Sequence, residues 1–295
     1  MKPLFTISAW LIAISALAQL QVADLQPLEI TGVRPQLSND GSRVAYLAES
    51  SLNVMELSSG KVWHVVYDVE LSDEVVFSPD GDMVAYSVQV YDNHLRYNEL
   101  YATDLVSTKR YALDKPSRRR NAYRFAGGEL RIGKVETVRR VSLRPDTKKA
   151  AHDYVLAIEE DDLVLYDGNR RRVLNPNGKN TYLWASLSPD EKKIVYMAVN
   201  DECHTFVYDL NTEVTDLGHY IAAPCWLDNQ TIIGQQDEDD GHQMTASRLV
   251  AIRADGTGFQ ILPTQGYEHP INPTAAANTI VFENDGKLVK MTLRD

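Results

Sequence analysis

The sequence predicts an all-β protein, a six-bladed β-propeller, and three observations indicate this fold class. A unit of strand, tight turn and strand recurs, and its clearest copy is FSPDGDMVAYSV from Phe77 to Val88. Six copies begin at residues 37, 77, 143, 187, 226 and 272, with spacings of 40, 66, 44, 39 and 46. Repeats of ~40–50 residues are typical of propeller blades. Valine and tyrosine are plentiful, and no long helical tract follows residue 20.

The turn in this unit follows from its residue types. Ser78, Pro79, Asp80 and Gly81 take its four positions. Proline presets φ at the second position of a type I turn, and serine and glycine suit the two ends. The next residues, Met83 to Val88, are apolar, β-branched or aromatic, which predicts a buried strand.

Five further copies define the remaining blades. They are LSNDGSRVAYLA at Leu37, LRPDTKK at Leu143 with its strand delayed to Tyr154, LSPDEKKIVYMA at Leu187, WLDNQTIIGQQ at Trp226 and NPTAAANTIVFE at Asn272. A hairpin and two further strands follow the repeated unit, so each blade is expected to contain four strands in chain order.

The first 18 residues have the features of a signal peptide. A short basic start precedes an apolar run over Leu4–Leu17, and Ala16-Leu17-Ala18 fits the small-x-small cleavage rule. The run is shorter than the ~20 residues of a membrane-spanning helix, which disfavours an anchor. We expect an exported, periplasmic or secreted/cell-surface protein, with a single propeller domain over 19–295 and no transmembrane segment after cleavage. In an exported chain Cys203 and Cys225 either pair or are two small buried residues.

The N-terminal strand is expected to close the ring. Gln26–Gly32 (QPLEITG) has the pattern of a strand but precedes the first turn. The last blade reaches Asp295 one strand short. An N-terminal strand in that place leaves no sheet edge open at the seam.

The 66-residue spacing between the second and third copies predicts a basic insertion at about 115–140. Lys115–Lys149 contains 12 Lys and Arg but only three acids, although the net charge of the chain is −11. Gly127-Gly128 lies between two alternating runs, which predicts a hairpin. Two interpretations stay open. The insertion contacts an anionic glycan, lipid headgroup or acidic protein through Arg118, Arg119 and Arg120, or it is an eroded blade edge whose charges pair internally.

Acidic residues gather in three predicted hairpins, EEDD, NDEC and DEDDG, starting at Glu159, Asn200 and Asp237. Hairpins between the second and third strands emerge on one face of a propeller, so these acids are expected on one rim. The rim either binds a cationic partner or a divalent ion, or only keeps the edge soluble. The candidate residues are Glu159, Glu160, Asp161, Asp162, Asp237, Glu238, Asp239 and Asp240. The overall negative charge argues against nucleic-acid binding.

The repeated turn and strand resemble those of TolB-like, WD-repeat-related propellers of bacterial envelopes. The matching residues are Ser78-Pro79-Asp80-Gly81 with Val84-Ala85-Tyr86, Ser188-Pro189-Asp190 with Ile194-Val195-Tyr196, and Ser38-Asn39-Asp40-Gly41 with Val44-Ala45-Tyr46. The resemblance covers nearly the whole predicted mature chain and implies the propeller architecture. The motif residues form turns and carry no chemistry of their own.

Propellers that resemble this one also occur in enzymes. The prolyl-oligopeptidase-like enzymes need ~200 further residues and a G-x-S-x-G nucleophile elbow, which this sequence lacks. Metal-dependent lyases of acidic sugars bind their metal largely through histidines. Here the candidates are His204, His219, His242 and His269, which come from successive late repeats but have no short paired spacing.

The sequence therefore favours a non-enzymatic, exported protein-binding or scaffolding propeller of the bacterial cell envelope. The expected partner is an envelope protein, with a glycan as a further possibility, and no cofactor or catalytic residue is predicted. The alternative is a carbohydrate-binding protein or a metal-dependent lyase acting on acidic sugars.

Overall fold

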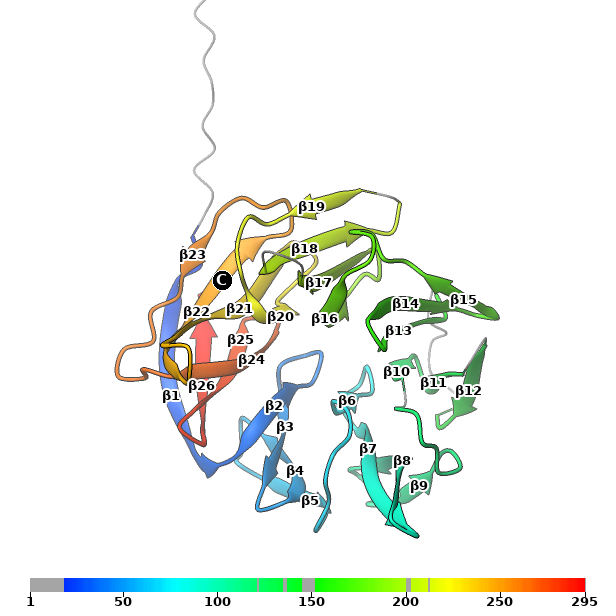
Figure 1. The fold of residues 1–295 in the computed structure, drawn as a ribbon. Coiled ribbons are helices and arrows are strands. Elements are labelled where there is room, and N and C mark those ends of the chain that lie inside the picture. Colours follow the sequence, from blue (N-terminus) through cyan, green and yellow to red (C-terminus); the bar gives the residue numbers. More distant parts are fainter. Residues whose placement is uncertain are drawn as a thin grey trace, which may run out of the picture.

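The computed structural model describes residues 19–120, 122–134, 137–144, 152–199, 203–211 and 213–294. In these ranges the chain forms 26 strands in seven sheets and no helix, so nothing there is a helix able to cross a membrane. The sheets stand side by side as blades around a central axis (Figure 1). The predicted signal peptide lies outside the described residues.

Five blades contain four strands in the described part of the chain. Blades 1 and 2 contain β2 (Val33–Leu37), β3 (Arg43–Ala48), β4 (Ser51–Glu56), β5 (Val62–Val66), β6 (Val76–Phe77), β7 (Met83–Asp92), β8 (Leu95–Asp104) and β9 (Arg110–Ala112). Blades 5 and 6 contain β16 (Thr181–Leu187), β17 (Lys193–Val199), β18 (Cys203–Asp209), β19 (Val214–Asp216), β20 (Ala222–Trp226), β21 (Thr231–Asp239), β22 (Met244–Arg253) and β23 (Gln260–Ile261). Blade 7 contains β24 (Pro270–Ala276), β25 (Thr279–Asn284), β26 (Lys287–Leu293) and β1 (Val22–Thr31).

Two blades have three described strands each. Blade 3 contains β10 (Ala122–Ala126), β11 (Glu129–Gly133) and β12 (Val138–Ser142). Blade 4 contains β13 (Tyr154–Glu159), β14 (Asp162–Asp167) and β15 (Arg170–Val173).

The ring has seven blades, so the prediction of six was wrong. The additional blade is blade 3, which lies in the basic segment that we predicted to be an insertion. Its first hairpin turns at Gly127-Gly128 as predicted, with Ala126 opposite Glu129. Blade 3 escaped prediction because a glycine pair replaces the SPDG-type turn, and counting one such turn per blade misses it.

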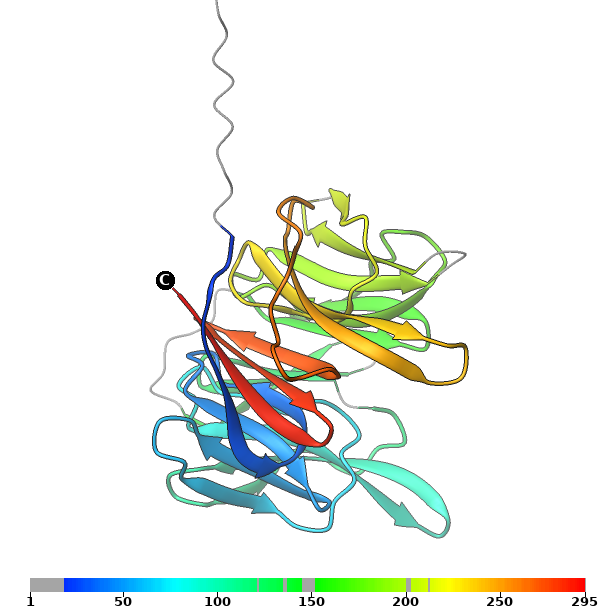
Figure 2. The ribbon, with the colours of Figure 1, turned by 90° about the vertical axis from the view of Figure 1, so that its left-hand side faces the viewer.

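The N-terminal strand β1 closes the ring by joining the C-terminal strands of blade 7 (Figure 2). It pairs antiparallel with β26, from Val22 opposite Leu293 to Thr31 opposite Lys287. The Gln260 side chain of blade 6 adds two bonds, because it accepts from the Leu20 N–H (3.0 Å) and donates to the Leu20 carbonyl (2.7 Å). The N-terminal strand therefore takes the predicted outer place in blade 7.

The Ser-Asp turns share one hydrogen-bond pattern. In blade 2 the Gly81 N–H donates to the Ser78 carbonyl (2.8 Å), and the Met83 N–H donates to Ser78 Oγ (2.9 Å). The Ser78 hydroxyl donates to Asp80 Oδ1 (2.5 Å). Gly81 has a φ of 72°, which suits glycine. The same bonds recur in the turns that begin at Ser38 and Ser188.

The core consists of apolar clusters between neighbouring blades. One cluster joins Leu52 of blade 1 to Val84 and Tyr86 of blade 2, and another joins blades 5 and 6. Tyr86 and Tyr196 are fully buried and come from the repeated strand after the turn, which explains the aromatic residue in that motif. Aromatic burial of this size supplies much of a core's hydrophobic stabilisation.

A β-bulge interrupts the innermost strand in four of the described blades. Each bulge contains one non-glycine residue with positive φ, a conformation that an ordinary strand does not contain. These residues are Arg34 (54°), Trp184 (49°), Ala223 (45°) and Asn272 (51°). The bulge breaks the alternation of side chains, so its residue is free to face the centre of the ring.

The two cysteines are both free thiols. Cys203 is exposed at the start of β18, and Cys225 is half-buried in β20. Burial raises the pKa of the Cys225 thiol to about 12, so it stays protonated at neutral pH.

Candidate functional site

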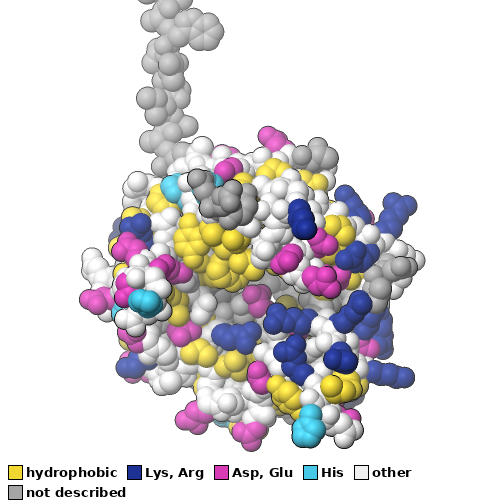
Figure 3. Space-filling model, in the orientation of Figure 1, with side chains coloured by type: hydrophobic (Ala, Val, Ile, Leu, Met, Phe, Trp, Pro, Cys, Tyr) yellow, Lys and Arg dark blue, Asp and Glu magenta, His cyan; other side chains and the backbone are white. Residues whose placement is uncertain are grey.

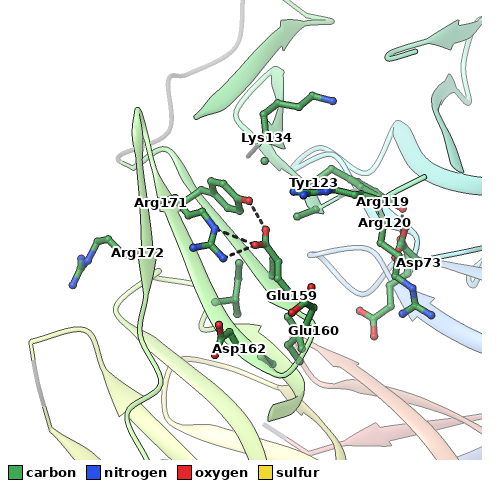
Figure 4. A pocket seen from close by; sticks show the side chains of 18 of the residues that line it. Asp73, Arg119, Arg120, Tyr123, Lys134, Glu159, Glu160, Asp162, Arg171 and Arg172 are labelled. Atoms are coloured by element: carbon green, nitrogen blue, oxygen red, sulfur yellow. Dashed lines mark hydrogen bonds and ion pairs between the residues drawn. The ribbon is translucent and has the colours of Figure 1, made fainter. Parts of the chain in front are cut away.

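The candidate site is a cleft of about 1310 Å³ on the inner side of blades 2 to 5. Its walls come from the segment before β6, the connection from β9 to β10, and strands of blades 3, 4 and 5. Figure 4 shows it from close by. Typical small-molecule pockets measure about 300–1,000 Å³. The cleft therefore has room for a segment of a macromolecule.

Arg119 and Arg120 form a cationic side of the cleft. Both side chains are exposed, and neither guanidinium group has an ion pair or hydrogen bond with another described residue. They lie across the cleft from Glu159 and Glu160 (Figure 4). Lys and Arg side chains gather on one side of this face (Figure 3). Arg118, the third predicted arginine, is exposed but does not line the cleft.

Most other cations of the basic segment are paired within the protein. The pairs are Arg124 with Glu191, Arg131 with Glu129 and Asp153, Lys134 and Arg139 with Asp114, Arg140 with Asp153, and Arg144 with Asp80, Asp82 and Asp104. Internal pairing, one of the two open interpretations, therefore describes these residues. Arg119 and Arg120 differ from them because their charges face the cleft.

Glu159, a predicted rim residue, belongs to a cluster within blade 4. Its Oε2 accepts from Arg171 Nε (3.0 Å) and Nη2 (2.6 Å), and its Oε1 accepts from the Tyr166 hydroxyl. Burial and the Glu159 carboxylate raise the pKa of Tyr166 to about 12, so the phenol stays protonated at neutral pH. The cluster neutralises Glu159 and holds its side chain on the cleft wall.

Two further side chains, each four residues before a turn serine, lie at the cleft. Trp184 precedes the turn serine Ser188 by four residues, lines the cleft and is 42% exposed. Glu74 precedes Ser78 by the same four residues. Its side chain is exposed, and the surface to which it is exposed is the inside of the cleft. Restricted hydration raises the pKa of the Glu74 carboxyl, and the nearby Arg34 charge opposes this shift. An exposed tryptophan and a carboxyl with raised pKa thus sit beside the arginines.

The remaining predicted acids do not form one site with Glu159. Asp162 lines the cleft and accepts from Asn175 Nδ2 (2.6 Å), whereas Asp161 is exposed at the hairpin and does not line it. Asp237, Glu238, Asp239 and Asp240 belong to the separate β21–β22 hairpin and do not line the cleft. In the predicted hairpin NDEC, Asn200 to Glu202 lie outside the described residues.

The four late histidines are dispersed. His204 Nδ1 lies 3.1 Å from Asp216, and His269 Nδ1 lies 3.1 Å from Asp285. His219 stacks on Phe259, and His242 is in the β21–β22 hairpin. Within the described ranges no group of three His, Cys, Asp or Glu residues is placed to hold a metal ion.

Glu74, Trp184 and Arg171 were not among the predicted site residues. A usable signal was present for two of them, because Glu74 and Trp184 stand four residues before a turn serine. The Arg170–Arg172 run was also visible, but it falls inside an ordinary repeat. Its middle member alone reaches Glu159, since side chains alternate along a strand.

No family model matches the chain, and no curated protein matches it. Solved structures are similar in fold. A chain of the mitotic checkpoint complex has a TM-score of 0.62 at 12% identity, with 99% of this chain and 98% of that chain covered.

Two other solved structures are longer than the matched region. TolB from Acinetobacter baumannii has a TM-score of 0.55 at 17% identity over 82% of this chain and 56% of that chain. The tricorn protease has a TM-score of 0.55 at 14% identity over 88% of this chain and 25% of that chain. The chain thus spans about half the length of TolB and a quarter of the tricorn protease. At these identities the likeness shows the propeller fold.

Proposed function

We propose that the chain is an exported, non-enzymatic protein-binding propeller of the bacterial cell envelope, and that the cleft holds an anionic segment of its partner. The observation that carries this proposal is the pair Arg119 and Arg120, whose guanidinium groups face a large cleft and have no ion pair or hydrogen bond with any other described residue. Guanidinium groups bind carboxylates through paired, charge-assisted hydrogen bonds.

The rest of the cleft suits binding of a macromolecule. Trp184 offers an exposed aromatic surface, and tryptophan and arginine are the residues that most often carry the energy of protein interfaces. The Glu159–Arg171–Tyr166 cluster is held by hydrogen bonds on both carboxylate oxygens, which favours a structural role. The dispersed histidines give no support to a metal-dependent lyase.

A labelled octaglutamate peptide tests the proposal. The variant Arg119→Ser/Arg120→Ser is expected to bind it about tenfold more weakly than the wild type, by fluorescence anisotropy at ~0.15 M salt. The control Lys115→Ser/Arg118→Ser removes the same charge from exposed residues outside the cleft. It is expected to retain binding within about twofold.

Three results would overturn the cleft proposal. The first is no binding of the peptide by the wild type. The second is an equal loss in both double variants, because it would indicate general electrostatic attraction. The third is preferential binding of an acidic oligosaccharide such as oligogalacturonate, which would favour the carbohydrate-binding alternative.

The export part of the proposal has its own test. The full chain should yield a periplasmic product whose first residue is Gln19, measured by mass spectrometry of the intact protein. Recovery of the unprocessed chain in the cytoplasm would contradict export.

A further inference from the structure

The inner edge of strand β13 in blade 4 is unpaired among the described strands. It pairs with β14 along its whole length, from Tyr154 opposite Asp167 to Glu159 opposite Asp162. No described strand pairs with its other edge. In blade 5 the equivalent strand, β17, is covered on that side by β16. Within the described residues, blade 4 therefore has no innermost strand to make it four-stranded.

This open edge faces the cleft. Five consecutive residues, Leu156 to Glu160, line the cleft. Successive side chains of a strand point to opposite faces, so a cleft against one face would meet alternate residues only. Contact with consecutive residues means that the cleft meets both faces of β13 and the edge between them, and it also extends to Arg170–Arg172 of β15.

The backbone groups on this edge can be identified. Arg124 Nη1 donates to the Tyr154 carbonyl (3.2 Å) from outside the β13–β14 ladder. Alternate residues of an antiparallel edge strand point their N–H and C=O groups away from the partner. Leu156 and Ile158 therefore present theirs to the cleft. Ala157, opposite Val164, points its own toward β14.

The strand that would be expected at the inner edge of β13 is β12, and it pairs in blade 3 instead. In blades 1, 2 and 5 the strand before the Ser-Asp turn pairs with the strand after it. The strand before the predicted turn at Leu143 is β12, and it pairs with β11 in blade 3, with Arg131 opposite Arg140. As a consequence, β12 does not take the inner place of blade 4, and neither does any other strand in the described part of the chain.

We propose that an extended, acidic segment of a partner protein binds along β13 as a fourth, inner strand and completes blade 4. The inference rests on the proposed function and specifies how the partner is held. Strand addition takes its affinity from main-chain hydrogen bonds and its specificity from alternate side chains. Acidic side chains of the added strand face Arg119 and Arg120, and Trp184 lines the same cleft.

The test uses an acetylated peptide of alternating Glu and Val, eight residues long, and two copies that are N-methylated on one or the other alternate set. N-methylation removes backbone donors and keeps every charge. The unmodified peptide should bind. The copy that is methylated on the N–H groups facing β13 should bind at least about tenfold more weakly, because it can no longer donate to the backbone of that strand.

Hydrogen exchange of the backbone amides adds a second measurement. A peptide that is held only by the charges of its side chains would not change these exchange rates. On peptide binding, the amides of Leu156 and Ile158 should exchange at least severalfold more slowly, while Ala157 stays unchanged because β14 already protects it.

The two proposals fail differently. Peptide binding that depends on Arg119 and Arg120, but with equal affinity for all three peptides and no change at Leu156 and Ile158, overturns strand addition and leaves the proposed function standing. Peptide binding that is absent, or insensitive to Arg119→Ser/Arg120→Ser, overturns both.

Discussion

Blades 2 and 4 differ at their innermost position. In blade 2 the chain forms β6, turns at Ser78–Gly81 and continues as β7, so the strand before the turn covers the strand after it. In blade 4 the strand before the predicted turn, β12, pairs with β11 of blade 3, and the inner edge of β13 faces the cleft. The same order of strand, turn and strand therefore has two outcomes, and the contacts available to the first strand decide between them.

The contacts at the two places differ in kind. Blade 2 packs on both neighbours through large apolar clusters, which contain Tyr86 and Leu100. The smallest cluster lies where blade 3 meets blade 4, around Val155 and Tyr166, and Arg131 joins the blades there by an ion pair to Asp153. Ion pairs lose much of their attraction to the cost of desolvation, whereas apolar contacts gain from it. The contact between blades 3 and 4 therefore depends on specific ion pairs more than the contacts of blade 2 do, and the cleft lies beside it.

Replacing Arg131 by alanine should have the largest effect on this comparison. Its side chain is 5% exposed and pairs with Glu129 and with Asp153 (2.8 Å). Loss of one partner of a buried pair costs ~3–5 kcal/mol, and because the acids are partly hydrated we expect about 2–3 kcal/mol. The free energy of unfolding in urea measures it. The control Arg139→Ala removes a half-exposed partner of Asp114 and should cost less than ~1 kcal/mol. Equal small losses in the two variants would show that the contact between blades 3 and 4 does not depend on Arg131.

Replacing Ser78 by alanine should have an intermediate effect in blade 2. Ser78 is buried, and its hydroxyl accepts from the Met83 N–H. A buried donor without a partner costs ~1–3 kcal/mol, so we expect a loss of about 1–2 kcal/mol in the free energy of unfolding. Ser107→Ala, on an exposed loop, is the control and should change it by less than ~0.5 kcal/mol. A neutral Ser78→Ala would mean that the proline and aspartate suffice to form the turn.

The smallest expected effect is a pH dependence at Asp80, where blade 2 meets the end of β12. Burial raises the pKa of Asp80, but hydrogen bonds from Ser78 and Asp82 and the charge of Arg144 outweigh it and hold the pKa below its usual value. A depressed pKa in the folded state stabilises the protein fully above about pH 4 and less as pH falls through the folded pKa.

Asp80→Asn should therefore reduce the loss of stability below about pH 4, by less than ~1 kcal/mol because the side chain is 38% exposed. Urea unfolding at a series of pH values measures the difference. Asp92→Asn, at an exposed position, controls for the loss of one negative charge. An unchanged pH profile in Asp80→Asn would show that the contacts of Asp80 with Ser78, Asp82 and Arg144 do not stabilise the folded state.

The sequence predicted some residues of the candidate site but not the cleft that they line. Arg119, Arg120 and Glu159 were predicted candidates, and the structure brings them to one cleft. The free edge of β13 at the cleft depends on the pairing of β12 with β11, which leaves β13 without an inner partner among the described strands. Strand pairing of this kind joins residues that no local pattern connects, so composition and spacing did not reveal it.

The sequence by itself determined the propeller class, the Ser-Asp turns and the closure by the N-terminal strand. These features depend on local preferences, such as the φ of Pro79 and the alternation of apolar residues, or on counting strands at the two ends. Only the tertiary structure decided that there are seven blades, that β12 belongs to blade 3, and that Arg119 and Arg120 face a cleft while Arg131 is buried in a pair. The reason is physical, because a strand with two free edges can pair with either neighbour, and a charge can face water or a carboxylate. The packing of the whole ring chooses between these outcomes.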